Sequence, residues 1–171
     1  MNAITRRWVL ILAAMTVSGW TGIGMALMLG ISTEQLTRES DAVVQGEVTE
    51  KTSHWSDDGR TILTTVRIVP AEVVRGRLDG QELVLEYEGG EVGDVGLKVS
   101  DSVSFEQGEH VLVFVRMKSK GLHEVVGRAQ GKYTLRQGLA RKGGFSVHGP
   151  RDMVDDEIDV TVLKERIKRI Q

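Results

Sequence analysis

One apolar run constrains the fold of this chain more than any other feature of its sequence. It is Val111-Leu112-Val113-Phe114-Val115, five successive positions without a polar side chain. Such a run, rich in β-branched and aromatic residues, is typical of a strand buried on both faces, and it is too short to indicate a helix. We therefore expect the domain to be built around this strand, which a turn at Gly108-Glu109 precedes.

A glycine-rich connection leads into this region. Gly89, Gly90, Gly93 and Gly96 stand among acidic residues and valines. Glycine adopts positive φ at low cost, so this spacing favours turns or bulges over a continuous strand.

The rest of the chain after residue 31 predicts short strands separated by turn signals. Gly46, in the middle of the first strand, predicts a bulge, and Pro70 predicts that the second strand ends at an edge or continues with a bend. The expected strands are Ala42–Glu50, Ile62–Ile68, Leu83–Tyr87, His110–Val115, Leu122–Val126, Lys132–Arg136 and a final edge strand, Gly143–Val147, with a polar loop at Lys51–Arg60.

Helices are expected only at the two flanks. Ser32 and Gln35 have the spacing of a capping box and predict a short helix anchored by Leu36. Near the C-terminus the helical spacing of Val160, Leu163, Ile167 and Ile170 predicts an amphipathic helix. Strands with flanking helices predict a mainly β fold, a small OB-like barrel over residues 27–150, followed by a C-terminal helical segment at 151–171.

Residues 1–26 have the features of a signal peptide. Arg6 and Arg7 precede an uncharged run, Trp8–Gly30, and small residues stand before a cleavage point after Ala26. We expect export from the cytoplasm, to the periplasm or the exterior. The alternative is an uncleaved anchor, since the run is long enough to span a bilayer and would then be the chain's contact with a membrane.

Composition excludes several classes of function. The chain has no cysteine, so disulfides, thiolate metal sites and cysteine catalysis are excluded. Its net charge is −2, and without the leader arginines the body is more acidic still, which disfavours binding to a nucleic-acid backbone. No metal site and no cofactor are predicted, since the histidines lack ligand spacing and the glycines of residues 90–96 are not followed by the helix of a dinucleotide site.

Three carboxylates are the strongest catalytic alternative. Glu86, Glu88 and Glu91 form a row that could support hydrolysis, as paired carboxylates do in glycosidases. A solvated strand edge explains the same pattern, and we expect no catalytic residue here.

Three stretches of the sequence, Ser40–Val48, Val92–Val99 and Gly108–Phe114, carry a resemblance to a known family. The first resembles the first strand of netrin-like modules, such as those in tissue inhibitors of metalloproteinases, and the other two together resemble their later barrel segment. Residues 32–136 also resemble a group of uncharacterised exported bacterial proteins. The resemblance implies an OB-like barrel and an exported protease as a partner. Those inhibitors chelate the protease zinc through an N-terminal cysteine, which this chain lacks, so their mechanism does not transfer to any residue here.

The predicted binding site lies on loops at one end of the barrel, because rigid barrels display loops well. Trp55 is the one tryptophan after the leader, and tryptophan is enriched at interface anchors. The expected partner is a protein; an oligosaccharide-binding module and a hydrolase are the alternatives. The predicted site residues are Trp55, Asp57, Asp58, Glu91, Val92, Asp94 and Val95.

Overall fold

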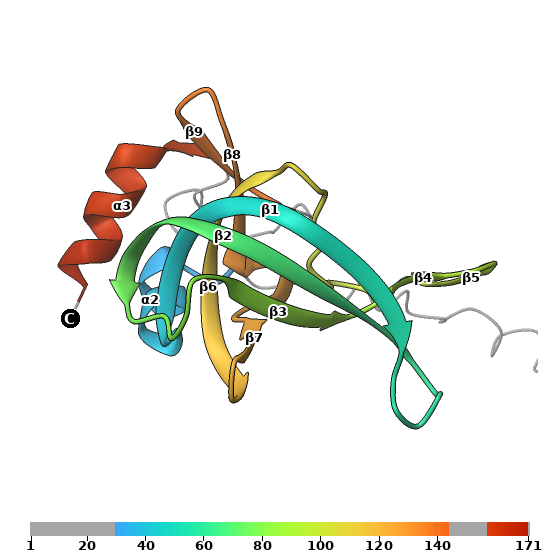
Figure 1. The fold of residues 1–171 in the computed structure, drawn as a ribbon. Helices are drawn as coiled ribbons and strands as arrows, with labels where there is room; N and C mark the ends of the chain where they lie inside the picture. Colours follow the sequence, from blue (N-terminus) through green and yellow to red (C-terminus); the bar gives the residue numbers. More distant parts are fainter. Residues whose placement is uncertain (1–29, 144–156, 171) are drawn as a thin grey trace, which may run out of the picture.

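The structure, a computed structural model, describes residues 30–143 and 157–170. Its fold is mainly β, with a short helix before the strands and another after them, which confirms the predicted fold class (Figure 1). In chain order the elements are α2 (Thr33–Glu39), β1 (Ala42–Trp55), β2 (Ile62–Gly76), β3 (Leu83–Glu88), β4 (Gly90–Val92), β5 (Val95–Leu97), β6 (His110–Ser119), β7 (Leu122–Val125), the 3-10 helix η1 (Arg128–Gly131), β8 (Lys132–Arg136), β9 (Leu139–Lys142), β10 (Glu157–Asp159) and α3 (Val160–Arg169).

Five strands close into a barrel. Their order is β1-β2-β3-β7-β6, and β6 returns to β1 by antiparallel pairing of His110–Val115 with Ala42–Glu47. The β3–β7 pair is parallel, so the barrel is mixed. On the edge opposite β1, β6 also pairs with β8 through Val111–Val113. β9 and β10 then extend the sheet beyond the barrel. None of the helices in the described ranges is long and apolar enough to cross a membrane.

Strand β6 is the centre of the fold, as its sequence predicts. All five residues from Val111 to Val115 are fully buried. Val111, Val113 and Val115 face the barrel interior, whereas Leu112 and Phe114 belong to a second cluster under the helices. Burial on both faces explains why no polar residue interrupts the run.

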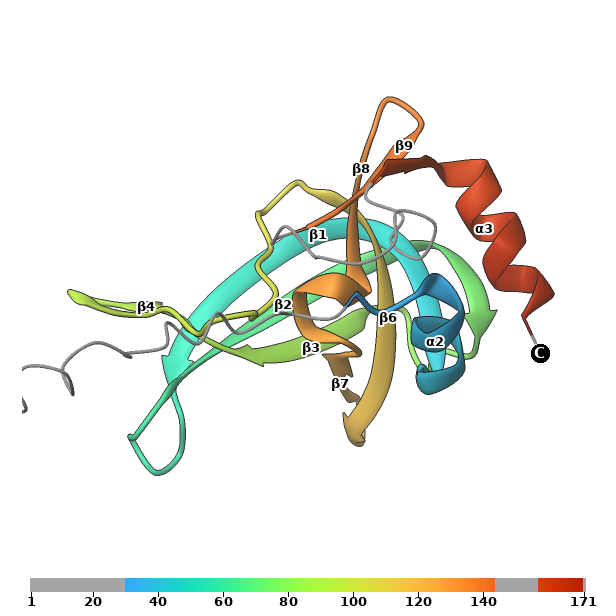
Figure 2. The ribbon, with the colours of Figure 1, turned by 180° about the vertical axis from the view of Figure 1, so that it is seen from behind.

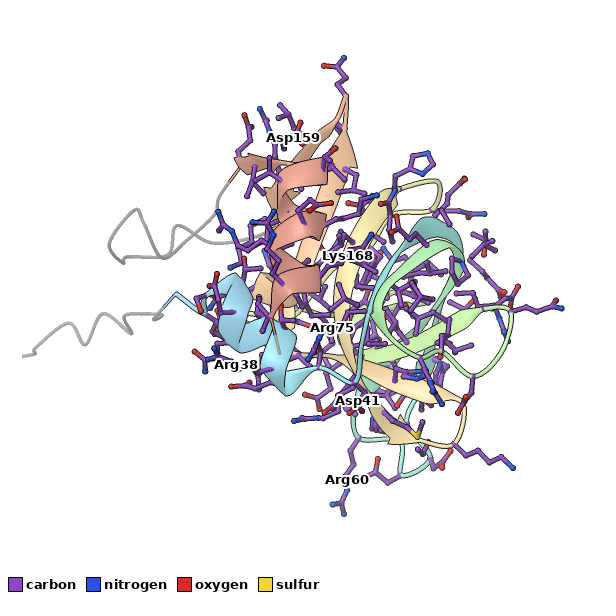
Figure 3. The ribbon with its side chains drawn as sticks, turned by 90° about the vertical axis from the view of Figure 1, so that its left-hand side faces the viewer. Arg38, Asp41, Arg60, Arg75, Asp159 and Lys168 are labelled. Atoms are coloured by element: carbon purple, nitrogen blue, oxygen red, sulfur yellow. The ribbon has the colours of Figure 1, made fainter. Side chains whose placement is uncertain are left out.

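Both predicted helices are present and pack on this second cluster (Figure 3). The Ser32 hydroxyl caps α2 by accepting from the Gln35 N–H at 3.1 Å. The Gln35 side chain donates to Glu39 instead of returning to Ser32, so the reciprocal half of the capping box is absent. In α3, Leu163 and Ile167 are buried, as the apolar spacing predicts.

Opposite charges hold α3 against the barrel. Glu72 on β2 accepts hydrogen bonds from Lys164 at 2.7 Å and Lys168 at 2.9 Å. Hydrogen bonds from Lys164 and then Lys168 lower the pKa of the Glu72 carboxyl. The C-terminal helix is thereby fixed to the outside of β2.

The first strand is longer than its sequence predicts. β1 continues beyond Glu50 to Trp55, which pairs with Ile62, so the predicted polar loop at Lys51–Arg60 is wrong over its first half. The error has a physical cause: the side chains of Lys51–Trp55 are mostly polar and none of them is buried on either face, so this part of β1 lacks the alternation that identifies a strand, although its partner Ile62–Val66 has it. The predicted turn at Asp58-Gly59 is confirmed, with φ of +66° at Gly59.

Gly46 and Pro70 lie opposite each other at a bend in this hairpin. The register shifts between Gln45 and Gly46, which confirms the predicted bulge. A Cβ atom on Gly46 would lie 2.4 Å from the Val69 carbonyl oxygen, so only glycine fits there. β2 continues through Pro70 to Gly76, and beyond Ile68 it pairs with β1 and no longer with β3, so this continuation is also an edge of the described sheet.

Two further predictions differ from the structure. The glycine-rich connection has positive φ at Gly89, Gly90 and Gly93, as expected, but it also forms the short hairpin β4–β5. The sheet beyond β8 is extended by β9, which its short and mostly polar sequence did not indicate. Of the predicted strand Gly143–Val147, Gly143 is not in a strand and the remainder lies outside the described residues.

Candidate functional site

Two hairpins extend from the same end of the barrel and carry all the predicted site residues. Figures 1 and 2 show the β1–β2 tip and the β4–β5 hairpin on the side of the molecule opposite α2 and α3. Trp55, Asp57 and Asp58 lie at the β1–β2 tip, and Glu91, Val92, Asp94 and Val95 lie in the β4–β5 hairpin. The structure thus brings the two predicted groups to one end.

Hydrogen bonds join the bases of the two hairpins. The buried Thr64 hydroxyl donates to the Gly89 carbonyl at 2.5 Å and lies 2.8 Å from the Ser53 hydroxyl. The Gly89 N–H donates to the Ile62 carbonyl at 2.8 Å. A Cβ atom on Gly90 would lie 2.3 Å from both hydroxyl oxygens, so the chain passes directly over them. These hydrogen bonds were not predicted, although a threonine at an inward position of an alternating strand, here Thr64, is their signal in the sequence.

The tip of the β1–β2 hairpin is ordered by Asp58. Its carboxylate accepts from the Ser56 hydroxyl at 2.7 Å and from the Arg60 N–H at 3.1 Å. The hydrogen bond from Ser56, then that from Arg60, lowers the pKa of the Asp58 carboxyl. Asp58 therefore shapes the turn, whereas the neighbouring exposed Asp57 is directed to solvent.

Trp55 ends β1 in an exposed position. Its exposed fraction is 44%, although its partner across the hairpin, Ile62, is buried. Trp55 belongs to neither hydrophobic cluster. A large apolar side chain left at the surface beside acidic residues is a typical feature of a contact surface.

The β4–β5 hairpin has two different faces. Val92 and Val95 pair across it and share one face with Leu97, while Glu91 lies on the other face opposite Gly96. Val95 is 50% exposed. The hairpin thus presents an apolar face and an acidic face.

A cleft of about 260 Å³ opens at the base of these hairpins, between β3, the segment after β5, and β7. Glu86 and Glu88 line it, and Glu86 pairs with Lys118 at 2.8 Å. Glu91 does not line the cleft, so the glutamate row is divided between two surfaces. The other lining residues are Leu63, Tyr87, Val99, Ser102, Val103, Lys118, Glu124, Val125 and Arg128.

A buried ion pair fixes the connection between β5 and β6. Lys132 on β8 donates to Glu109 at 2.7 Å and to the Ser104 carbonyl at 2.5 Å, and its ammonium lies 4.7 Å from the Phe105 ring centre. Thr134 donates to the second Glu109 oxygen at 2.5 Å. Burial raises the pKa of Glu109, but the hydrogen bonds from Lys132 and Thr134 outweigh it and leave that pKa below its usual value. This pair is structural and was not foreseen from sequence.

The described residues contain no group of three or more histidine, aspartate or glutamate side chains placed to hold a metal ion. His54 and His110 are exposed and far apart in the sheet register, and His123 is buried on β7; His148 lies outside the described residues. Comparisons with models of known protein families, with curated proteins and with solved structures found no match.

Proposed function

We propose that this protein is an exported, non-catalytic binding module that contacts a protein partner through the two hairpins. The observation that carries the proposal is their arrangement: both leave one end of the barrel, are joined at their bases and expose Trp55 and Val95. Because the bases are fixed, little ordering entropy opposes binding. The acidic side chains around these anchors favour a partner whose surface is basic.

A protein partner fits this end better than an oligosaccharide does. Sugar sites generally stack rings on exposed aromatic side chains, and Trp55 is the one largely exposed aromatic among the described residues. Phe105, Phe114 and Tyr133 are buried in the core. The hydrolase alternative is also less favoured, because Glu86 is engaged by Lys118 rather than facing a second free carboxylate.

The proposal includes export through the leader at residues 1–26, on the basic and apolar pattern described above. It also includes an OB-like identity for the barrel, supported by the resemblance to netrin-like modules and by the closed five-strand arrangement. The resemblance makes an exported protease the first partner to test.

The test compares Trp55→Ala with Val73→Ala, a matched change at another exposed apolar residue, of 40% exposed fraction, on β2. Each purified protein is used to capture partners from the envelope fraction, and its melting curve is recorded. We expect Trp55→Ala to lose about 2 kcal/mol of binding, about thirtyfold in affinity, with an unchanged melting temperature. Retained capture by Trp55→Ala, together with a lowered melting temperature, would show that Trp55 supports the fold instead.

A further inference from the structure

We propose that the partner binds as an extended strand added to the free edge of β5, and that this strand alternates apolar and basic side chains. The inference rests on the proposed function and specifies how the same end of the barrel recognises its partner. It follows from the placement of the β4–β5 hairpin, from its two faces and from its charge.

The outer edge of β5 is open to another strand. In the described ranges β5 pairs only with β4, while β4 contacts β1 and β2 at the base. Figures 1 and 2 show the hairpin standing clear of the barrel, with no other labelled element along it. A two-stranded ribbon alone is marginally stable in water, so a third strand would stabilise it.

The main chain of Gly96 points toward this open edge. Gly93, with φ of +59°, and Asp94 form a two-residue turn between the paired residues Val92 and Val95. The pair that flanks such a turn, here Val92 and Val95, is a hydrogen-bonded pair, and hydrogen-bonded and non-hydrogen-bonded pairs alternate along an antiparallel ribbon. The next pair, Glu91 and Gly96, is therefore a non-hydrogen-bonded one. The N–H and C=O groups of Gly96 are therefore directed away from β4, where an added strand would meet them.

The two faces of the hairpin determine the side chains of that strand. Successive residues of a strand point to opposite faces. On one face they meet Val95 and Leu97, which favours apolar side chains. On the other they meet Gly96, over which the Glu91 side chain of β4 reaches, with its Cγ 3.6 Å from the position of a Cβ there, and this favours lysine or arginine. Asp94 at the tip adds a second negative charge, and Lys98 lies beyond β5 at the base.

The same charges disfavour a second copy of this chain as the occupant. Pairing of two identical hairpins through β5 would bring Glu91 and Asp94 of both copies to one small sheet. Like charges at short range across strands are destabilising. A partner strand of opposite charge meets no such repulsion.

The experiment measures binding of synthetic peptides to the full mature protein by calorimetric titration. The first probe contains three Lys-Val repeats, the second three Glu-Val repeats, and the third has the lysines and valines of the first in two separate blocks. We expect the alternating basic peptide to bind, and the other two to bind at least about tenfold more weakly. Equal binding of the alternating and block peptides would overturn the proposal, because it would show attraction by charge alone.

Two substitutions at Gly96 form a matched pair. A Cβ atom there meets only the Glu91 side chain, at 3.6 Å, so Gly96→Ala fits and keeps the N–H. Gly96→Pro removes the N–H and should bind the peptide about tenfold more weakly than Gly96→Ala, which keeps it. Circular dichroism checks that both variants fold. Equal affinity of the two variants would overturn strand addition.

A charge reversal gives a test independent of the proline substitution. Glu91→Lys should bind the Glu-Val peptide in preference to the Lys-Val peptide, whereas Glu47→Lys, an exposed position on β1, should keep the original preference. An unchanged preference in Glu91→Lys would contradict the assigned faces. A dimer in light scattering that Gly96→Pro dissociates would show that a second copy occupies the edge.

These outcomes are distinguishable from failure of the proposed function. If Trp55→Ala abolishes partner capture and Gly96→Pro does not, the hairpin end binds a partner but not by strand addition. If neither substitution affects capture, the hairpin end is not the binding site and both proposals fail.

Discussion

Removal of the buried Lys132 ammonium should destabilise the protein strongly. Lys132 and Glu109 have side-chain exposed fractions of only 8% and 13%. Lys132→Met fills a similar volume but leaves the Glu109 carboxylate buried with Thr134 and a main-chain N–H as its partners. Breaking a buried ion pair from one side typically costs about 3–5 kcal/mol.

This cost should appear in thermal unfolding followed by circular dichroism. For a chain of this size 1 kcal/mol corresponds to about 2–4 °C, so Lys132→Met should lower the melting temperature by about 10 °C. Adding Glu109→Gln removes the uncompensated charge and keeps one acceptor oxygen, which Thr134 can use. We expect the double variant to recover at least half of the loss.

The control is the exposed pair Arg116–Glu124, whose side chains are 55% and 37% exposed. Arg116→Met should cost at most about 1 kcal/mol, because solvent screens exposed pairs. The reasoning is refuted if Lys132→Met costs no more than Arg116→Met, or if the double variant is less stable than Lys132→Met alone.

Three further predictions follow from the core, the α3 clamp and the leader. Val113→Asp places a charge at a fully buried position of β6. It should abolish the circular dichroism spectrum of the folded protein, because the free energy of unfolding of a domain is only about 5–15 kcal/mol. A soluble variant with an unchanged spectrum would contradict the central role of this strand. Glu72→Gln should lower the melting temperature slightly at neutral pH and not at all in strong acid. The pKa of Glu72 is lowered in the folded state, so its contribution to stability is present above the pKa of the unfolded chain and is lost as the pH falls through the folded-state pKa. An equal loss of melting temperature at both pH values would show that the ion pairs of Glu72 do not hold α3. Intact mass of the exported protein should give an N-terminus near Leu27, and recovery of Met1 in a membrane-integrated product would show an anchor instead.

Hydrophobic pattern was sufficient to predict the core of the fold. The run Val111–Val115, the alternation from Ile62 to Ile68 and the stripe of α3 all correspond to buried faces. Gly46 was informative for a different reason, since a glycine inside an apolar strand indicates a local steric requirement, here the approach of the Val69 carbonyl.

The outer parts of the structure could not be predicted in the same way. The extension of β1 to Trp55 and the β4–β5 hairpin are held by main-chain hydrogen bonds, which any sequence can make, and their side chains are largely exposed. The joining of the hairpin bases by Thr64 and Gly89 and the Lys132–Glu109 pair link residues distant in the chain. The periodicity of a single sequence carries no information about such contacts. The predicted site residues do lie on the two hairpins, because turn signals identified both connections.

The attachment of residues 31–33 has a consequence for the timing of folding during synthesis. The Ile31 N–H donates to the Gln130 side chain at 2.7 Å, the Ile31 carbonyl accepts from Lys142 at 2.9 Å, and Thr33 lies 3.3 Å from the Tyr133 hydroxyl. A chain emerges with its N-terminal end first, so none of these contacts can form until about a hundred more residues have followed. Residues 31–33 therefore remain unattached throughout most of translation, and they become fixed only when the last strands of the barrel sheet arrive.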